Sequence, residues 1–191
     1  MTTDEAGAAT LGADYVLGVD VGTTFTAAAT HRGGRTEIAA LGNHAPPIPS
    51  LVFLREDGEI LVGEAAERRG VAEPHRLARE FKRRVGDETP ILLAGSPYSA
   101  ERLIAAVLRE VVAMVSAREG GKPAAIAVSH PANWGAFKTD LLRQACGLAG
   151  LQDVTLVTEP VAAAVHYSSN ERLEPGATIA VAPGSSRSFE E

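Results

Sequence analysis

The stretch Asp20-Val21-Gly22-Thr23-Thr24 combines residue types that suit a phosphate group and its magnesium ion. Gly22 can take a backbone angle that is closed to other residues, so that amide N–H groups approach an anion, and the carboxylate of Asp20 can hold a hydrated cation. Thr23 and Thr24 add two hydroxyls. A turn that merely joins two strands favours the same residue types, so the spacing leaves both a nucleotide site and a simple hairpin open.

Three further residues stand at the ends of expected elements: Lys82, Pro131 and Glu159. Glu159 follows an apolar strand and precedes a helix, at the kind of strand end where ligands gather in open α/β sheets. Its carboxylate either stabilises the helix N-terminus or polarises a water molecule, and the sequence leaves both roles open. Lys82 lies in a charged segment and, considered alone, is expected at the surface. Pro131 lies in the turn His130-Pro131-Ala132-Asn133-Trp134.

The elements that must position these residues begin with an antiparallel meander. Short apolar runs at 15–21, 25–31 and 37–41 are separated by glycine-containing turns. Residues 43–50 contain three prolines and are expected as a connector, because proline cannot donate to a central strand. A smaller sheet or hairpin is then expected at 51–54 and 59–62, around Asp57-Gly58.

The second half of the chain predicts helices alternating with strands. Residues 64–86 are charged and helical in pattern, and 99–118 form the clearest helix, with Ser99 as its cap. A β-α-β-α-β succession follows, which predicts parallel strands that extend the meander into one mixed α/β sheet. Its expected elements are 123–129, 135–148, 154–157, 160–167 and 178–181.

Composition narrows the class of protein further. The chain of 191 residues is 45% hydrophobic, enough for a sizeable core. Its net charge of −6 argues against nucleic acid and anionic membrane as partners, and no apolar run has the length of a membrane span.

A single cysteine, Cys146, permits no disulfide within the chain and is expected as a buried apolar residue; this fits a cytoplasmic protein. The first residues lack the pattern of a secretory signal. The five histidines lack zinc-ligand spacing, and no hydrolase triad motif is evident.

In their order along the chain, these motifs resemble the nucleotide-binding domain of the seventy-kilodalton heat-shock (DnaK-type) chaperones, in the actin-like ATPase superfamily. The resemblance runs from Tyr15 to about Val181. It rests on Gly18-Val19-Asp20-Val21-Gly22-Thr23-Thr24, Ile48-Pro49-Ser50, Leu61-Val62-Gly63, Phe81-Lys82-Arg83-Arg84-Val85-Gly86, His130-Pro131-Ala132-Asn133-Trp134, Ala145-Cys146-Gly147-Leu148-Ala149-Gly150-Leu151 and Glu159-Pro160-Val161-Ala162-Ala163-Ala164.

The resemblance implies a ribonuclease-H-like lobe over residues 14–182, with an inserted α+β subdomain at about 43–121. Residues 1–13 and 183–191 are expected as a flexible extension and a flexible tail. The implied cofactors are ATP or ADP and Mg²⁺. By the same resemblance Asp20 holds the magnesium through water, and Gly22, Thr23 and Thr24 contact phosphate. Lys82 and Glu159 assist the attack of water on the γ-phosphate, and Pro131 relays the nucleotide state.

The chain also departs from the family pattern. Residues 183–188 replace a second phosphate loop and lack its aspartate and its glycine run, Thr139 stands where the family has an arginine, and Asn133 replaces an aromatic residue. The expected function is an ATP-binding, chaperone-type ATPase lobe that hydrolyses ATP only with a second lobe from a longer chain or a partner protein. Two alternatives stay open: a degenerate lobe that acts as a protein-interaction module, and a fragment of a sugar or acetate kinase.

Overall fold

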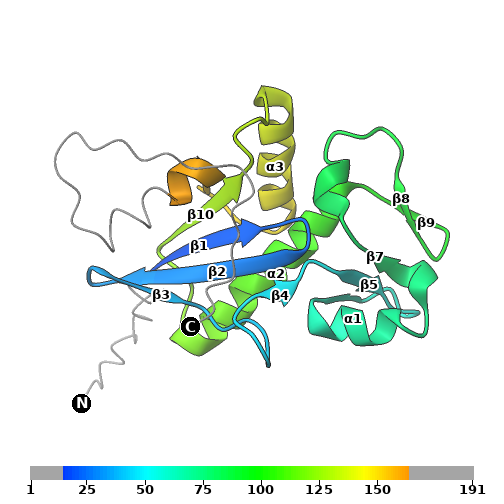
Figure 1. The fold of residues 1–191 in the computed structure, drawn as a ribbon, viewed down its shortest axis with the longest axis horizontal. Coiled ribbons are helices and arrows are strands. Elements are labelled where there is room, and N and C mark those ends of the chain that lie inside the picture. Colours follow the sequence, from blue (N-terminus) through cyan, green and yellow to red (C-terminus); the bar gives the residue numbers. More distant parts are fainter. Residues whose placement is uncertain (1–14, 164–191) are drawn as a thin grey trace, which may run out of the picture.

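A mixed six-stranded sheet organises residues 15–163, the part of the chain that the structure, a computed structural model, describes (Figure 1). Its first strands form the predicted antiparallel meander, and two later strands lie parallel to β1, so the α/β fold class is confirmed. The strand order is β11-β10-β1-β2-β3, and a short β4 also pairs with β2. The strands are β1 (Val16–Val21), β2 (Phe25–Arg32), β3 (Arg35–Ile38), β4 (Ile48–Pro49), β10 (Ala125–His130) and β11 (Thr155–Thr158).

Alternation along β1 separates the core from the site. Leu17, Val19 and Val21 are buried, whereas Asp20 between the last two is exposed. In a strand, successive side chains point to opposite faces, so the apolar set packs inward and Asp20 emerges on the other face. The core of the sheet is therefore the feature that aims the carboxylate outward.

Two long helices contribute to this core. The helix α2 (Ala100–Glu119) begins where Ser99 Oγ accepts a hydrogen bond from the Arg102 amide at 3.3 Å, which confirms Ser99 as its cap. It passes behind β1 and β2 in the view of Figure 1. The helix α3 (Ala136–Leu148) packs against α2 and carries the buried Cys146, as predicted. Burial raises the pKa of the Cys146 thiol to about 11, so this thiol is a packing group and no nucleophile near neutral pH.

The elements between β4 and α2 form sheets of their own beside the main sheet (Figure 1). The predicted hairpin around Asp57-Gly58 is present as β5 (Val52–Leu54) and β6 (Ile60–Val62). A third strand, β7 (Leu77–Ala78), pairs with β5, and the helix α1 (Glu64–Gly70) lies against them. That these elements constitute an inserted subdomain at about 43–121 stays a prediction.

The expectation of a continuous helical pattern over 64–86 is wrong. After α1 the chain makes a 3₁₀ turn at Pro74–Arg76, then β7, then a second 3₁₀ turn at Phe81–Arg84 that we term η2. Pro74 interrupts an α-helix, and Glu80 takes a left-handed φ of 53° just before η2. Arg76 fastens the first of these turns: its guanidinium donates to the Leu54 carbonyl at 3.3 Å and lies 2.9 Å from Glu73.

Several other details differ from the sequence analysis. The third strand of the meander was expected at 37–41 but ends at Ile38, and the connector at 43–50 contains the two-residue strand β4. A hairpin of β8 (Ile91–Leu93) and β9 (Ser96–Tyr98) was not predicted, because its turn, Ala94-Gly95, lacks the usual Asn-Gly or Asp-Gly pair.

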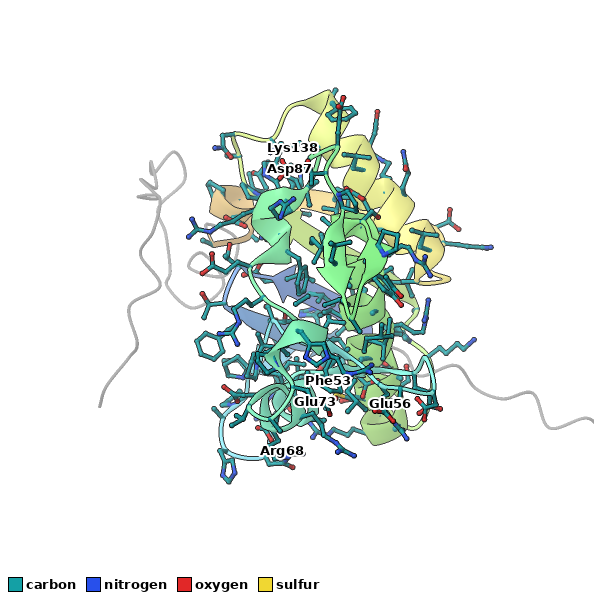
Figure 2. The ribbon with its side chains drawn as sticks, turned by 90° about the vertical axis from the view of Figure 1, so that its right-hand side faces the viewer. Phe53, Glu56, Arg68, Glu73, Asp87 and Lys138 are labelled. Carbon is teal, nitrogen blue, oxygen red and sulfur yellow. The ribbon has the colours of Figure 1, made fainter. Side chains whose placement is uncertain are left out.

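Figure 2 shows how far apart the labelled side chains of the connecting elements and of α3 lie. Phe53, Glu56, Arg68 and Glu73 lie toward one end of the molecule, and Asp87 and Lys138 toward the other. Helix is present at 159–163, where a helix at 160–167 was expected. The expected strand at 178–181, the extension at 1–13 and the tail at 183–191 lie outside the described residues. No helix of residues 15–163 has the length and hydrophobicity needed to cross a membrane.

Candidate functional site

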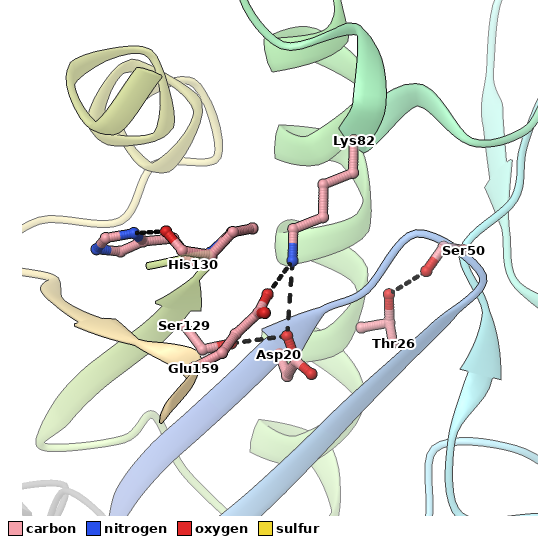
Figure 3. Close-up of polar contacts among 8 residues, drawn as sticks. Asp20, Thr26, Ser50, Lys82, Ser129, His130 and Glu159 are labelled. Atoms are coloured by element: carbon pink, nitrogen blue, oxygen red, sulfur yellow. Dashed lines mark hydrogen bonds and ion pairs between the residues drawn. The ribbon is translucent and has the colours of Figure 1, made fainter. Parts of the chain in front are cut away.

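Three neighbouring parallel strands end at one place on the sheet. The register pairs Val19 of β1 with Val128 of β10, and His130 of β10 with Thr158 of β11. The residues at these ends, Asp20, Ser129 and Glu159, therefore come together although they are far apart in the sequence (Figure 3). This is the edge of an α/β sheet at which ligands usually bind.

Lys82 projects into this place from η2 (Figure 3). Its Nζ lies 2.8 Å from Glu159 Oε1 and 3.8 Å from Asp20 Oδ1. The side chain of Lys82 is only 8% exposed, whereas those of Asp20 and Glu159 are 53% and 42% exposed. The expectation from its charged neighbourhood, a surface lysine, is therefore wrong.

The burial of Lys82 follows from the residues that flank it. Phe81 and Val85 are each 1% exposed and anchor η2 in the core, so the lysine between them is drawn inward. A buried ammonium needs charged or polar partners, and the two carboxylates supply them. One positive and two negative charges thus share a site whose carboxylates face water.

The third strand end adds a residue that the sequence analysis passed over. Ser129 Oγ donates a hydrogen bond of 2.7 Å to Asp20 Oδ1. Sequence reasoning treated Ser129 only as part of a strand end. The signal that could have found it is topological: if β1 and β10 are adjacent parallel strands with Val19 beside Val128, the next residues, Asp20 and Ser129, must be neighbours.

The turn after β1 joins β1 to β2 in an antiparallel hairpin. Of the two hypotheses for this turn, a nucleotide site and a simple hairpin, the hairpin is present. The Gly22 amide donates to the Phe25 carbonyl at 3.0 Å. Gly22 does not have a positive φ, so the predicted special backbone angle is wrong. Glycine is needed for another reason: a Cβ at this position would lie 2.4 Å from the Phe25 carbonyl oxygen.

Hydrogen bonds made by the amide and the hydroxyl of Ser50 hold this turn in place. Its amide donates to the Thr24 carbonyl at 2.8 Å, and its hydroxyl pairs with that of Thr26 at 2.8 Å, both side chains being buried (Figure 3). The turn is thereby fixed, with Thr24 exposed and Thr23 partly exposed. A hairpin does not exclude anion binding, so the phosphate contacts of Gly22, Thr23 and Thr24 stay a hypothesis.

Pro131 directly follows the last residue of β10. Its carbonyl oxygen lies 3.0 Å from His130 Nδ1 and accepts the Trp134 amide at 3.1 Å. The rings of His130 and Trp134 are stacked at 6.3 Å, and Lys82 Nζ stands 6.0 Å from the centre of the Trp134 ring. The predicted turn is thus ordered by its own contacts and reaches the lysine through Trp134.

The carboxylates of the site suit a magnesium ion only through the water molecules that the ion keeps. Within residues 15–163 no group of three or more His, Cys, Asp or Glu side chains could enclose a metal ion. Magnesium commonly keeps several waters and binds through one or two carboxylates and the phosphates of its substrate. The exposed carboxylate of Asp20 suits such an indirect contact.

The mixed sheet, its meander and its parallel strands fit the fold of the actin-like ATPases. The family model described as "Hsp70 protein" matches residues 16–92. Over 158 residues, 80% of this chain, the sequence is 35% identical to "Chaperone protein DnaK" of Elusimicrobium minutum (strain Pei191) and 32% identical to the protein of the same name from Endomicrobium trichonymphae. The chain belongs to the Hsp70 family and corresponds to part of its nucleotide-binding domain. It covers about a quarter, 25%, of the length of these relatives.

Proposed function

We propose that the chain binds ATP or ADP with Mg²⁺ at the Asp20–Thr24 turn and serves as one lobe of a chaperone-type ATPase. The observation that carries the proposal is the buried Lys82, held between Asp20 and Glu159 where three strands end. A buried lysine between two water-facing carboxylates, beside a turn that contains glycine and two threonines, supplies the charges that phosphoryl transfer requires. Membership of the Hsp70 family supports the same function.

Each residue of the proposed site would contribute a different chemical group to nucleotide binding. Gly22, Thr23 and Thr24 would present amides and hydroxyls to the phosphates, and Asp20 would accept hydrogen bonds from the waters of a magnesium ion. The ammonium of Lys82 has three donors, so it can keep Glu159 at 2.8 Å and still turn an N–H toward a phosphate oxygen. Bound magnesium would supply further neutralisation of phosphate charge.

Glu159 is placed to orient the attacking water. Its carboxylate is 42% exposed, Lys82 engages Oε1, and among residues 15–163 no hydrogen bond or ion pair engages Oε2. A carboxylate in this position can accept a proton from water or align it for attack. The other hypothesis, that Glu159 only stabilises the helix that starts at residue 159, predicts no effect on hydrolysis.

Hydrolysis on this proposal needs a second lobe, from a longer chain or a partner protein, because positioning requires the nucleotide to be enclosed. Pro131 would relay the nucleotide state, since its turn is linked to Lys82 through Trp134. We do not propose nucleic acid or membrane as partners, and we propose a cytoplasmic location.

Calorimetric titration with Mg-ATP tests the proposal directly. The purified chain should show saturable binding that the Asp20→Ala variant has lost, with circular dichroism confirming that both proteins are folded. Absence of heat from the folded wild-type chain would refute nucleotide binding and favour the alternative of a protein-interaction module.

A further inference from the structure

The exposed carboxylate of Asp20 needs a partner that fixes its orientation. An aspartate side chain that is 53% exposed can occupy several rotamers in water. Lys82 Nζ, at 3.8 Å from Oδ1, is too distant for a hydrogen bond and exerts an attraction with little directionality. The hydrogen bond of 2.7 Å from Ser129 Oγ to the same oxygen is short and directional. Ser129 is therefore the group that sets the rotamer.

The two contacts of Asp20 fall on one oxygen. Both Ser129 and Lys82 approach Oδ1, and among residues 15–163 no hydrogen bond or ion pair engages Oδ2. Among these residues Oδ2 is thus left available to water. Its direction is set by Ser129 and Lys82, which hold Oδ1. This is the arrangement expected of a carboxylate that must present one oxygen to the water shell of a cation.

We propose that Ser129 is a positioning residue for the metal: its hydroxyl orients the Asp20 carboxylate toward the hydrated Mg²⁺ that accompanies the nucleotide. This inference rests on the proposed function and adds a residue to it. Ser129 acts through Asp20, so it should contribute to affinity only when magnesium is present. A role in packing β10 or in contacting the nucleotide itself would affect affinity with or without the metal.

The test compares ADP binding in Mg²⁺ with ADP binding in EDTA, using calorimetry on the full chain. For Ser129→Ala we expect about a fivefold loss of affinity in Mg²⁺, equivalent to ~1 kcal/mol, and no change in EDTA. Ser129→Thr keeps the hydroxyl on a residue that suits a strand, so its affinity should stay within about twofold of wild type.

The outcomes separate this inference from the function on which it rests. Wild-type binding with an equal loss for Ser129→Ala in Mg²⁺ and in EDTA, or with no loss in either, refutes the inference and leaves the function standing. No binding by folded wild-type chain refutes both.

A nucleotide-free measurement checks the orienting contact separately. The ³J couplings of the Asp20 side chain, measured by NMR, should indicate one rotamer in wild type and in Ser129→Thr, and an average in Ser129→Ala. Unchanged couplings in Ser129→Ala would contradict the orienting role regardless of ligand.

Discussion

Replacing Gly22 by alanine should destabilise the hairpin on which the proposed site is built. The added Cβ would lie 2.4 Å from the Phe25 carbonyl oxygen, a separation at which backbone must move. Forcing an extra carbon into a packed position costs about 1–3 kcal/mol. Because the same turn carries Thr23 and Thr24, the shift should also lower nucleotide affinity.

Gly18→Ala is the matched control, since it makes the same chemical change four residues earlier, within β1. There the nearest atom to an added Cβ, the Ala29 carbonyl oxygen, lies 3.8 Å away, an ordinary contact. Glycine-to-alanine changes at unstrained positions stabilise by about 0.4–1 kcal/mol through the unfolded chain. The two variants should thus differ by about 1.4–4 kcal/mol in free energy of unfolding.

Urea denaturation followed by circular dichroism measures this difference. With an m-value of about 2 kcal/mol/M, the midpoint of Gly22→Ala should lie about 0.7–2 M below that of Gly18→Ala. Equal midpoints would show that the turn accommodates a side chain, and the argument that close approach demands glycine at position 22 would fail.

Other predictions concern the charges and the thiol. In an assembly that hydrolyses ATP, Glu159→Gln should lower kcat about 100-fold or more while changing the dissociation constant of Mg-ATP less than about threefold; equal losses in both would indicate positioning alone. Lys82→Met should lower kcat by about 10²–10³, and its folding, checked by circular dichroism, should persist because the two carboxylates left behind face water. Burial raises the pKa of the Cys146 thiol from 9.0 to about 11, so this thiol ionises at lower pH in the unfolded chain than in the folded chain. The stability that the neutral thiol contributes is therefore complete below pH 9 and is lost as the pH rises toward 11. Cys146→Ala should remove this part of the alkaline loss of stability in urea titrations, and identical pH profiles for the two proteins would refute it.

Much of the sheet could be predicted because its signals are local. The apolar runs of β1 and β2, the Asp57-Gly58 turn and the cap at Ser99 each encode their element within a few residues. The segment from 64 to 86 could not be predicted in the same way. Its charges follow helical spacing, yet the pairing of β7 with β5 and the anchoring of Phe81 are tertiary contacts that override the local pattern.

The candidate site shows the same division. Asp20, Glu159 and the turn were recognisable from residue types at strand ends, whereas the burial of Lys82 depends on Phe81 and Val85 entering a core formed by distant segments. Ser129 was missed because a serine at the end of a strand carries no signal until the neighbouring strand is known. The reason for glycine at position 22 likewise required coordinates, since a close carbonyl cannot be inferred from sequence.

The most direct test of the central claim is to map where Mg-ADP binds by recording amide NMR signals of the ¹⁵N-labelled chain during a titration. Our expectation is that the largest shifts fall at 20–24, at 81–84 in η2 and at 129–134, the segments that meet at the ends of β1 and β10. Shifts confined to α1 or to the β8–β9 hairpin, or no shifts in a folded chain, would contradict it.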